Sequence, residues 1–227
     1  MQDEVPGAFD PASDLDPLEV RVLGVLAEKE ALTPDNYPLT LNAVMNGCNQ
    51  LSSREPVMQL AEDVVHDTLQ RLMQRKLVAG ISQAGARTVK FEHRMRIKWS
   101  LEQDKLAVLT ILMLRGLQTA GEIRARSGRL YDFASVGAVE AALQFLIDKY
   151  PPLVARLERA PGAKESRYGH LLGGEIALTE AAAPAAAGGA AAGGGGRVGQ
   201  LEQEVAALRA EVEALKAEFA SFRQQFE

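Results

Sequence analysis

An internal repeat restricts the fold of this 227-residue chain more than any other feature. In each copy, one residue separates two pairs of aliphatic residues, and a threonine follows after six further residues. Three pairs of segments match in the same order: 22–33 with 108–119, 65–72 with 139–146, and 77–81 with 153–157. The shared order indicates two copies of one domain of roughly 80 residues, with about ten extra residues inside the first.

Each copy shows the same order of predicted elements, three helices followed by a β-hairpin. The first helix runs from Pro17 to about Glu30 and carries one apolar stripe, formed by Leu18, Val22, Val25 and Leu26. The capping residues are predicted as Asp16 with Glu19 in the first copy and Ser100 with Gln103 in the second, where Gly116 ends the helix. The remaining elements, first copy and then second, are short helices at 39–48 and 120–127, third helices at 61–75 and 135–149, and strand pairs at 77–82 with 88–93 and 153–158 with 165–171.

Three helices and a hairpin, with a turn between the second and third helices, describe a winged helix. We therefore expect an α+β fold that is predominantly helical, with two tandem winged-helix domains and a C-terminal coiled-coil helix. The predicted boundaries are 1–14 for a disordered acidic N-terminus, 15–98 and 99–176 for the two winged-helix domains, 177–196 for a flexible Ala/Gly linker, and 197–227 for the coiled coil.

The last 30 residues carry the heptad pattern of a coiled coil. Apolar residues alternate at spacings of four and three: Leu201, Val205, Leu208, Val212, Leu215, Phe219, Phe222 and Phe226. Flanking charges pair between parallel chains, as Glu204 with Arg209 and Glu211 with Lys216. These patterns predict a parallel homodimer, and the alternative is one amphipathic helix that folds back on its own domain.

Charge is distributed unevenly along the chain, whose net charge is −5. Residues 1–63 carry a net charge of −9, residues 64–180 carry +6, and residues 181–227 carry −2. The middle segment can therefore present a basic surface despite the acidic total. Cys48 is the single cysteine, which excludes an internal disulfide and a cysteine metal cluster. With no signal peptide and no membrane-spanning run, we expect a cytoplasmic protein with no membrane contact.

Several longer motifs occur in a specific order. The segment from Thr33 to Ala43 reads TPDNYPLTLNA, and it is followed by NGCNQ from Asn46 and SREPVM from Ser53. The second copy contains RGLQT from Arg115, Pro161-Gly162, ESRY from Glu165 and HLL from His170. Together they closely resemble the YceH-like family of uncharacterised bacterial proteins over about residues 15–175. The resemblance implies a tandem winged-helix fold and no established activity, and members are often described only in terms of DNA binding or transcription. Gly47 departs slightly, since relatives tend to have alanine or another small residue there.

Basic residues gather at three places and are the candidate contacts for double-stranded DNA. They are Arg87, Lys90, Arg94 and Arg96 in the first hairpin and the segment after it, Arg124, Arg126 and Arg129 in the second short helix and its turn, and Arg156, Arg159, Lys164 and Arg167 in the second hairpin. Glu92 lies beside Lys90 and partly neutralises the first hairpin. The alternative is a solvated charged surface without a ligand.

The predicted third helices differ in their outer faces. The first exposes Glu62, Asp63 and Asp67, which repel phosphate, so it is a poor reader of the major groove. The second exposes small and neutral residues, which allow close approach to a groove or to another protein: Ser135, Gly137, Ala138, Ala141 and Gln144.

Polar residues from Asn42 to Arg54 admit two interpretations. Asn46, Asn49 and Gln50 have the chemistry to read adenine edges and Arg54 to contact guanine or phosphate, but we favour a role in tying down the long turn. Cys48 in this segment is expected to be a small buried apolar residue. His170 is either a phosphate contact or a packed strand residue.

No spacing of residues indicates a metal site, a cofactor site or a catalytic centre, so we expect a non-enzymatic protein. The first hypothesis is a dimeric DNA-binding protein, such as a transcriptional regulator. The alternative is a protein-interaction adaptor that uses its winged-helix surfaces. A continuous surface of the basic residues of both hairpins and the second short helix favours DNA, whereas scattered basic residues weaken that hypothesis.

Overall fold

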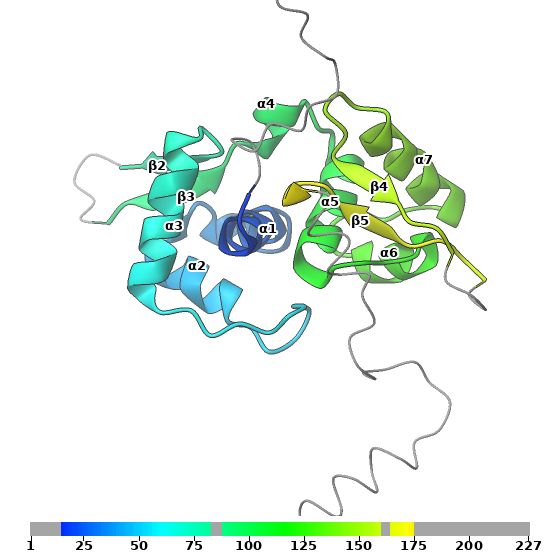
Figure 1. The fold of residues 1–227 in the computed structure, drawn as a ribbon. Coiled ribbons are helices and arrows are strands. Elements are labelled where there is room, and N and C mark those ends of the chain that lie inside the picture. Colours follow the sequence, from blue (N-terminus) through cyan, green and yellow to red (C-terminus); the bar gives the residue numbers. More distant parts are fainter. Residues whose placement is uncertain (1–14, 83–87, 160–163, 175–227) are drawn as a thin grey trace, which may run out of the picture. The chain divides into compact units, whose positions relative to one another are not determined.

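The computed structural model describes residues 15–82, 88–159 and 164–174, which form a mixed, mainly helical fold with small antiparallel sheets (Figure 1). The elements of the first half, residues 15–99, are α1 (Pro17–Leu32), the 3-10 helix η1 (Pro34–Asn36), β1 (Leu39–Thr40), α2 (Leu41–Cys48), α3 (Glu62–Gln74), β2 (Val78–Ile81), β3 (Lys90–His93) and α4 (Met95–Trp99). Those of the second half, residues 100–174, are α5 (Gln103–Arg115), α6 (Ala120–Ser127), α7 (Val136–Ile147), β4 (Val154–Arg156) and β5 (Tyr168–His170).

The predicted order of three helices and a hairpin is present in both halves. In the first half, β3 pairs with β2 and also with β1, where Leu39 lies opposite Phe91. In the second half, β4 pairs with β5, and Gln118 forms a single antiparallel bridge with Tyr168. The bridge takes the place of β1, so the sheets repeat as well as the helices. A two-residue strand leaves no period in the sequence, and β1 was therefore not predicted.

Two predictions about helix starts have different outcomes. The capping box at Asp16 is confirmed, because its carboxylate accepts from the Glu19 backbone N–H at 2.8 Å while Glu19 accepts from the Asp16 backbone N–H at 3.0 Å. The assignment of Ser100 as the cap of α5 is wrong. Ser100 has φ +51° and ends α4, and Glu102 occupies the N-cap of α5. The short helix α4 was not predicted, and it moves the start of α5 past Ser100.

Helix α1 is buried on every side rather than along one stripe. Val20, Leu23 and Ala27 are buried like the stripe residues Val22, Val25 and Leu26, because α1 packs against α5, α3, α2 and β3, whereas Leu18 of the predicted stripe is only partly buried. Figure 1 shows α1 between the elements of the two halves. A Cβ at Gly24 would lie 2.8 Å from Leu114 Cδ2, so the small residue permits close approach of α1 and α5. One core therefore runs through both halves.

Several predicted segments lie outside the described residues. They are the N-terminus 1–14, the turns at Gly85 and Pro161-Gly162, the linker 177–196, and the coiled coil 197–227 with its seam from Leu201 to Phe226. In the described ranges, no helix combines the length and hydropathy that crossing a membrane requires.

Candidate functional site

Two of the four candidate basic residues near the first hairpin are engaged with carboxylates. Arg94 forms an ion pair with Glu92 at 2.8 Å, and Arg96 forms one with Glu30 at 3.1 Å. Lys90 is exposed on β3, and Arg87 lies outside the described residues. The charges of Arg94 and Arg96 are therefore neutralised within the molecule, whereas that of Lys90 is not.

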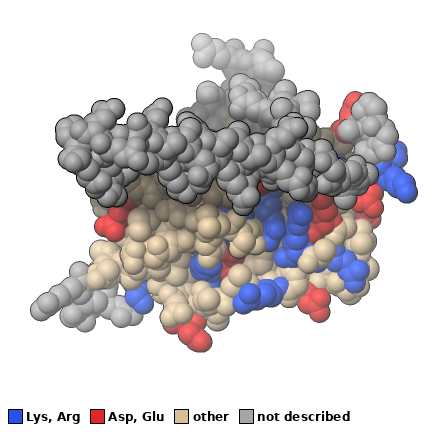
Figure 2. All heavy atoms as spheres, turned by 90° about the horizontal axis from the view of Figure 1, so that it is seen from below, with Lys and Arg blue, Asp and Glu red and all other residues tan. Residues whose placement is uncertain are grey.

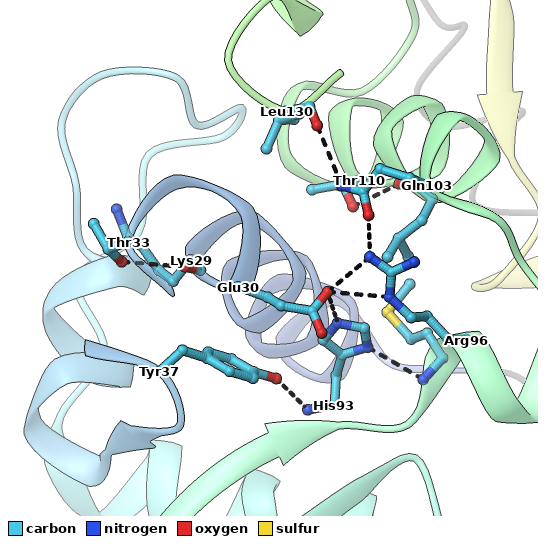
Figure 3. Close-up of polar contacts among 11 residues, drawn as sticks. Lys29, Glu30, Thr33, Tyr37, His93, Arg96, Gln103, Thr110 and Leu130 are labelled. Carbon is cyan, nitrogen blue, oxygen red and sulfur yellow. Dashed lines mark hydrogen bonds and ion pairs between the residues drawn. The ribbon is translucent and has the colours of Figure 1, made fainter. Parts of the chain in front are cut away.

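Arg96 belongs to a polar network that joins the two halves (Figure 3). Its guanidinium donates to Glu30 of α1 and to the side-chain oxygen of Gln103 of α5. His93, at the end of β3, approaches the same carboxylate with Nε2 at 3.2 Å, while its Nδ1 accepts from the backbone N–H of Met95. An accepting Nδ1 assigns the ring hydrogen to Nε2, so the histidine donates to Glu30.

The network lowers the pKa of Glu30. The hydrogen bond from His93 is the largest cause, burial opposes it, and the charge and hydrogen bond of Arg96 add to the lowering. Glu30 therefore remains ionised and holds Arg96 against α1. Gln103 extends the network by donating to the Leu130 carbonyl at 3.2 Å. Arg96 is a structural link between α1 and α5 in this arrangement, which the sequence did not indicate.

The polar segment after α2 ties down the long turn, as we favoured from the sequence. The Asn49 amide donates to the Leu60 carbonyl at 2.9 Å and accepts from the Leu60 N–H at 2.7 Å. Arg54 is buried, and its guanidinium forms a two-point contact with Glu28, at 3.0 Å and 2.6 Å. It also donates to the Gly47 carbonyl at 3.0 Å. Arg54 is thus fully engaged inside the protein.

Cys48 is buried at the end of α2, as predicted. Burial raises the pKa of its thiol to about 12, and the nearby charges of Arg21 and Arg54 only partly oppose this. A thiol with so high a pKa is a poor nucleophile at neutral pH. Groups of three or more His, Cys, Asp or Glu side chains suited to a metal ion do not occur in the described ranges.

The basic residues of the second half have different surroundings. Arg124 of α6 donates to the carbonyls of Phe133 and Ala134, both at 3.2 Å, immediately before α7. Arg167 donates to the Leu117 carbonyl at 3.2 Å. Arg156, Arg159 and Lys164 are exposed at the open end of the β4–β5 hairpin. Arg126 and Arg129 instead line a cavity together with Arg115. Arg115 is not among the basic residues that the sequence indicated as DNA contacts.

Ion pairing separates the two halves clearly. Within the first half, five arginines form ion pairs with carboxylates: Arg54, Arg71, Arg75, Arg94 and Arg96. In the second half, no ion pair within the described ranges involves Arg124, Arg126, Arg129, Arg156, Arg159, Lys164 or Arg167. Within the described ranges, the exposed arginines without an ion pair therefore lie in the second half, while the first half retains the exposed lysines Lys76, Lys90 and Lys98.

The two hairpins do not form one basic surface. Figure 1 shows the open ends of β2–β3 and β4–β5 at opposite sides of the described residues. Figure 2 shows Lys and Arg in separate groups on one face, with Asp and Glu between them. The basic residues of the two hairpins therefore do not form the continuous surface that would favour DNA contact through both hairpins.

The outer face of α3 is as the sequence predicts, whereas that of α7 agrees only in part. In α3, Glu62, Asp63 and Asp67 are exposed. In α7, Gly137 and Ala141 are exposed, and so are two larger apolar residues, Val136 at 38% and Phe145 at 42%. The face of α7 therefore combines small residues with larger apolar ones, and the exposed Glu140 makes it neither as small nor as neutral as predicted.

Comparison with known proteins identifies the family. Residues 15–163 match the family described as "Protein of unknown function, DUF480". The chain belongs to the DUF480 family. The match includes all three helices of both halves and both strands of the first hairpin, and it confirms the resemblance stated from the motifs.

Similarity to individual members extends beyond the DUF480 match. A UPF0502 protein from Herminiimonas arsenicoxydans is 64% identical over 219 residues, which cover 96% of this chain and 92% of that protein. One from Janthinobacterium sp. (strain Marseille) is 65% identical over 208 residues, 92% of this chain and 89% of that protein. One from Azoarcus sp. (strain BH72) is 54% identical over 225 residues, 99% of this chain and 100% of that protein. DUF480 relatives of this kind therefore share nearly the full length of the chain.

Proposed function

We propose that this DUF480 protein is a non-enzymatic DNA-binding protein. In this proposal the chain has two tandem winged-helix domains, and only the second domain contacts DNA. The observation that carries the proposal is the set of basic residues around α6 and the β4–β5 hairpin that form no ion pair within the described ranges: Arg124, Arg156, Arg159, Lys164 and Arg167. Positive charges that no carboxylate of the described ranges neutralises can supply the phosphate contacts on which DNA affinity mainly depends.

The helix α7 has the place of a recognition helix in this proposal. Its first turn is capped by Ser135, whose hydroxyl accepts from the Ala138 N–H at 3.2 Å. Small residues such as Gly137 and Ala141 on its exposed face allow the backbone to approach a groove. Arg124 lies just before this helix through its bonds to the Phe133 and Ala134 carbonyls, as a phosphate contact beside the groove requires.

The first domain has a different role in the proposal. The exposed carboxylates of α3 repel phosphate, and the arginines of its hairpin segment are paired with Glu92 and Glu30. Each chain then contributes one DNA-contacting surface. A parallel coiled coil of residues 197–227 would join two such surfaces in a homodimer.

Fluorescence anisotropy with random-sequence duplex DNA tests this proposal when it is titrated at several salt concentrations. The triple variant R124Q/R156Q/R167Q is expected to weaken binding by on the order of a hundredfold at 0.1 M salt. The negative slope of log K against log salt concentration should become shallower by about 0.9 for each phosphate that the variant no longer neutralises. A wild-type protein that fails to bind even at low salt contradicts the proposal.

A matched control separates local contact from total charge. The variant K76Q/K90Q/K98Q removes three positive charges from the first half, where all three lysines are exposed. It should bind DNA like the wild type. Equal decreases in affinity for the two triple variants would mean that net charge, and not the second domain, determines the affinity.

A protein-interaction adaptor is the second candidate, and the exposed face of α3 favours it. Glu62, Asp63 and Asp67 form an acidic surface that suits a basic protein partner, and the half-exposed Val64 adds an apolar contact. A pull-down with the wild type and with E62K/D63K/D67K tests this candidate. A partner that binds the wild type and does not bind the variant, together with absent DNA binding, would support the adaptor.

A further inference from the structure

We propose that the cavity between the two halves binds a small organic anion through Arg115, Arg126 and Arg129. The cavity has a volume of about 390 Å³ and is lined by residues of α1, of the loop after α2, of α5 and of the α6 terminus. This volume lies within the usual range for small-molecule sites. The inference goes beyond DNA binding, because the arginines involved are different from Arg124, Arg156 and Arg167.

Three arginines converge on this cavity from separate positions. Arg115 is the last residue of α5, Arg126 lies in the last turn of α6, and Arg129 follows that helix. None of the three has a carboxylate partner within the described ranges. Arg115 donates to the hydroxyl of Ser53, a neutral group of the first half. The three guanidinium groups therefore have no ion-pair partner in the described ranges, although the charge of Glu28 raises the pKa of Arg115 and so opposes the effect of Arg126.

The one carboxylate in the lining, that of Glu28, is already engaged. Arg54 contacts both of its oxygens, at 3.0 Å and 2.6 Å, and Lys29 lies 3.4 Å from one of them. Glu28 is thus held by Arg54. The three remaining arginines give the cavity an excess of positive charge.

The arginines act on one another. Burial lowers the pKa of Arg115 most, and the positive charge of Arg126 lowers it further. Arginine stays protonated in proteins, so the lowered pKa reports mainly the cost of burying the Arg115 guanidinium and, to a smaller extent, the cost of holding it near Arg126. The negative ends of the α5 and α6 dipoles reduce this cost for each arginine alone. They do not account for the convergence on one cavity, whereas an anion bound there would offset the repulsion.

The remaining lining residues define the rest of the ligand. Leu32, Ile111, Leu114 and Leu130 supply apolar surface beside the arginines. A ligand that suits both parts carries at least two negative charges, in carboxylate or phosphate groups, and a short apolar segment. Because residues of both halves line the cavity, the bound anion would link α1 and the loop at Ser53 to α5 and α6.

Isothermal titration calorimetry of the full chain with citrate and with pyrophosphate tests the proposal and distinguishes carboxylate from phosphate. Titrations at constant ionic strength should show binding to the wild type that weakens about tenfold or more in R115Q/R126Q. The control R156Q/R159Q removes the same charge outside the cavity and should bind the probe like the wild type. Absent binding of both probes to the wild type, or equal weakening in both variants, would overturn the proposal.

A second variant guards against loss of folding. Arg129→Gln changes an exposed residue beyond the end of α6, so the melting temperature without ligand should not change. Its probe affinity is still expected to fall, by roughly threefold or more. An unchanged affinity in Arg129→Gln overturns its assignment as a ligand contact. Duplex DNA affinity of R115Q/R126Q without citrate should match that of the wild type, which separates this inference from the proposed function.

Discussion

Replacing Arg54 by methionine should destabilise the protein strongly, because Arg54 neutralises a buried carboxylate. The Arg54 side chain is 0% exposed, and the Glu28 side chain is 10% exposed. Removing one partner of a buried pair costs about 3–5 kcal/mol, because the remaining charge is left without compensation. The Gly47 and Ser53 carbonyls are also deprived of donors, at about 1 kcal/mol each, while methionine recovers part of the packing.

Urea unfolding followed by circular dichroism measures this effect. We expect the free energy of unfolding of Arg54→Met to fall by about 4 kcal/mol, which corresponds to roughly 10 °C in melting temperature for a unit of this size. The double variant E28L/R54M should be less destabilised than Arg54→Met alone, since no buried charge is then left unpaired. A decrease under about 1 kcal/mol in the single variant, or additive effects in the double-mutant cycle, would refute the reasoning.

Three further predictions concern assembly and pH. Deleting residues 197–227 should convert a dimer into a monomer in light scattering, and an unchanged mass would place the dimer interface elsewhere. His170 should make the protein less stable as pH falls from 7.5 to 5, by about 2 kcal/mol, because burial lowers the pKa of the folded imidazole from 6.5 to about 4 and only the unfolded chain takes up the proton. Chemical unfolding at the two pH values should show this decrease in the wild type and not in His170→Gln. The lowered pKa of Glu30 contributes stability that is present above its ordinary pKa of 4.5 and is lost as pH falls through the lower folded value. Below pH 4.5 the free energy of unfolding should therefore depend less steeply on pH in Glu30→Gln than in the wild type. An unchanged pH dependence would contradict the network.

Local signals in the sequence predicted local structure well. The capping box of Asp16 and Glu19 and the bounds of α6 depend on residues a few positions apart, and both agree with the structure. The prediction of Ser100 as the N-cap of α5 was wrong because the local capping pattern is the same whether the preceding segment is extended or, as here, a short helix. The order of helices and hairpins followed from the repeat, which is a property of the whole sequence.

Long-range pairing was not accessible from the sequence. Glu30 and Arg96 are 66 residues apart, and Glu28 and Arg54 are 26 apart, with no spacing rule to connect them. From the sequence, Arg96 was a candidate DNA contact because it lies in a basic segment. In the structure its partner is the internal carboxylate of Glu30. Arg115 was overlooked for the same reason, because its two arginine neighbours meet it only after α5 and α6 pack together.

The burial of the middle of α1 on every side determines which part of the chain can exist alone. A fragment ending near residue 98 would expose the side of α1 that α5 normally covers, and a fragment beginning near residue 99 would expose the opposing side of α5. Neither half of the repeat is then an independent piece that could be expressed, exchanged or evolved by itself. Although the sequence contains the domain twice, the two copies should unfold in a single cooperative transition.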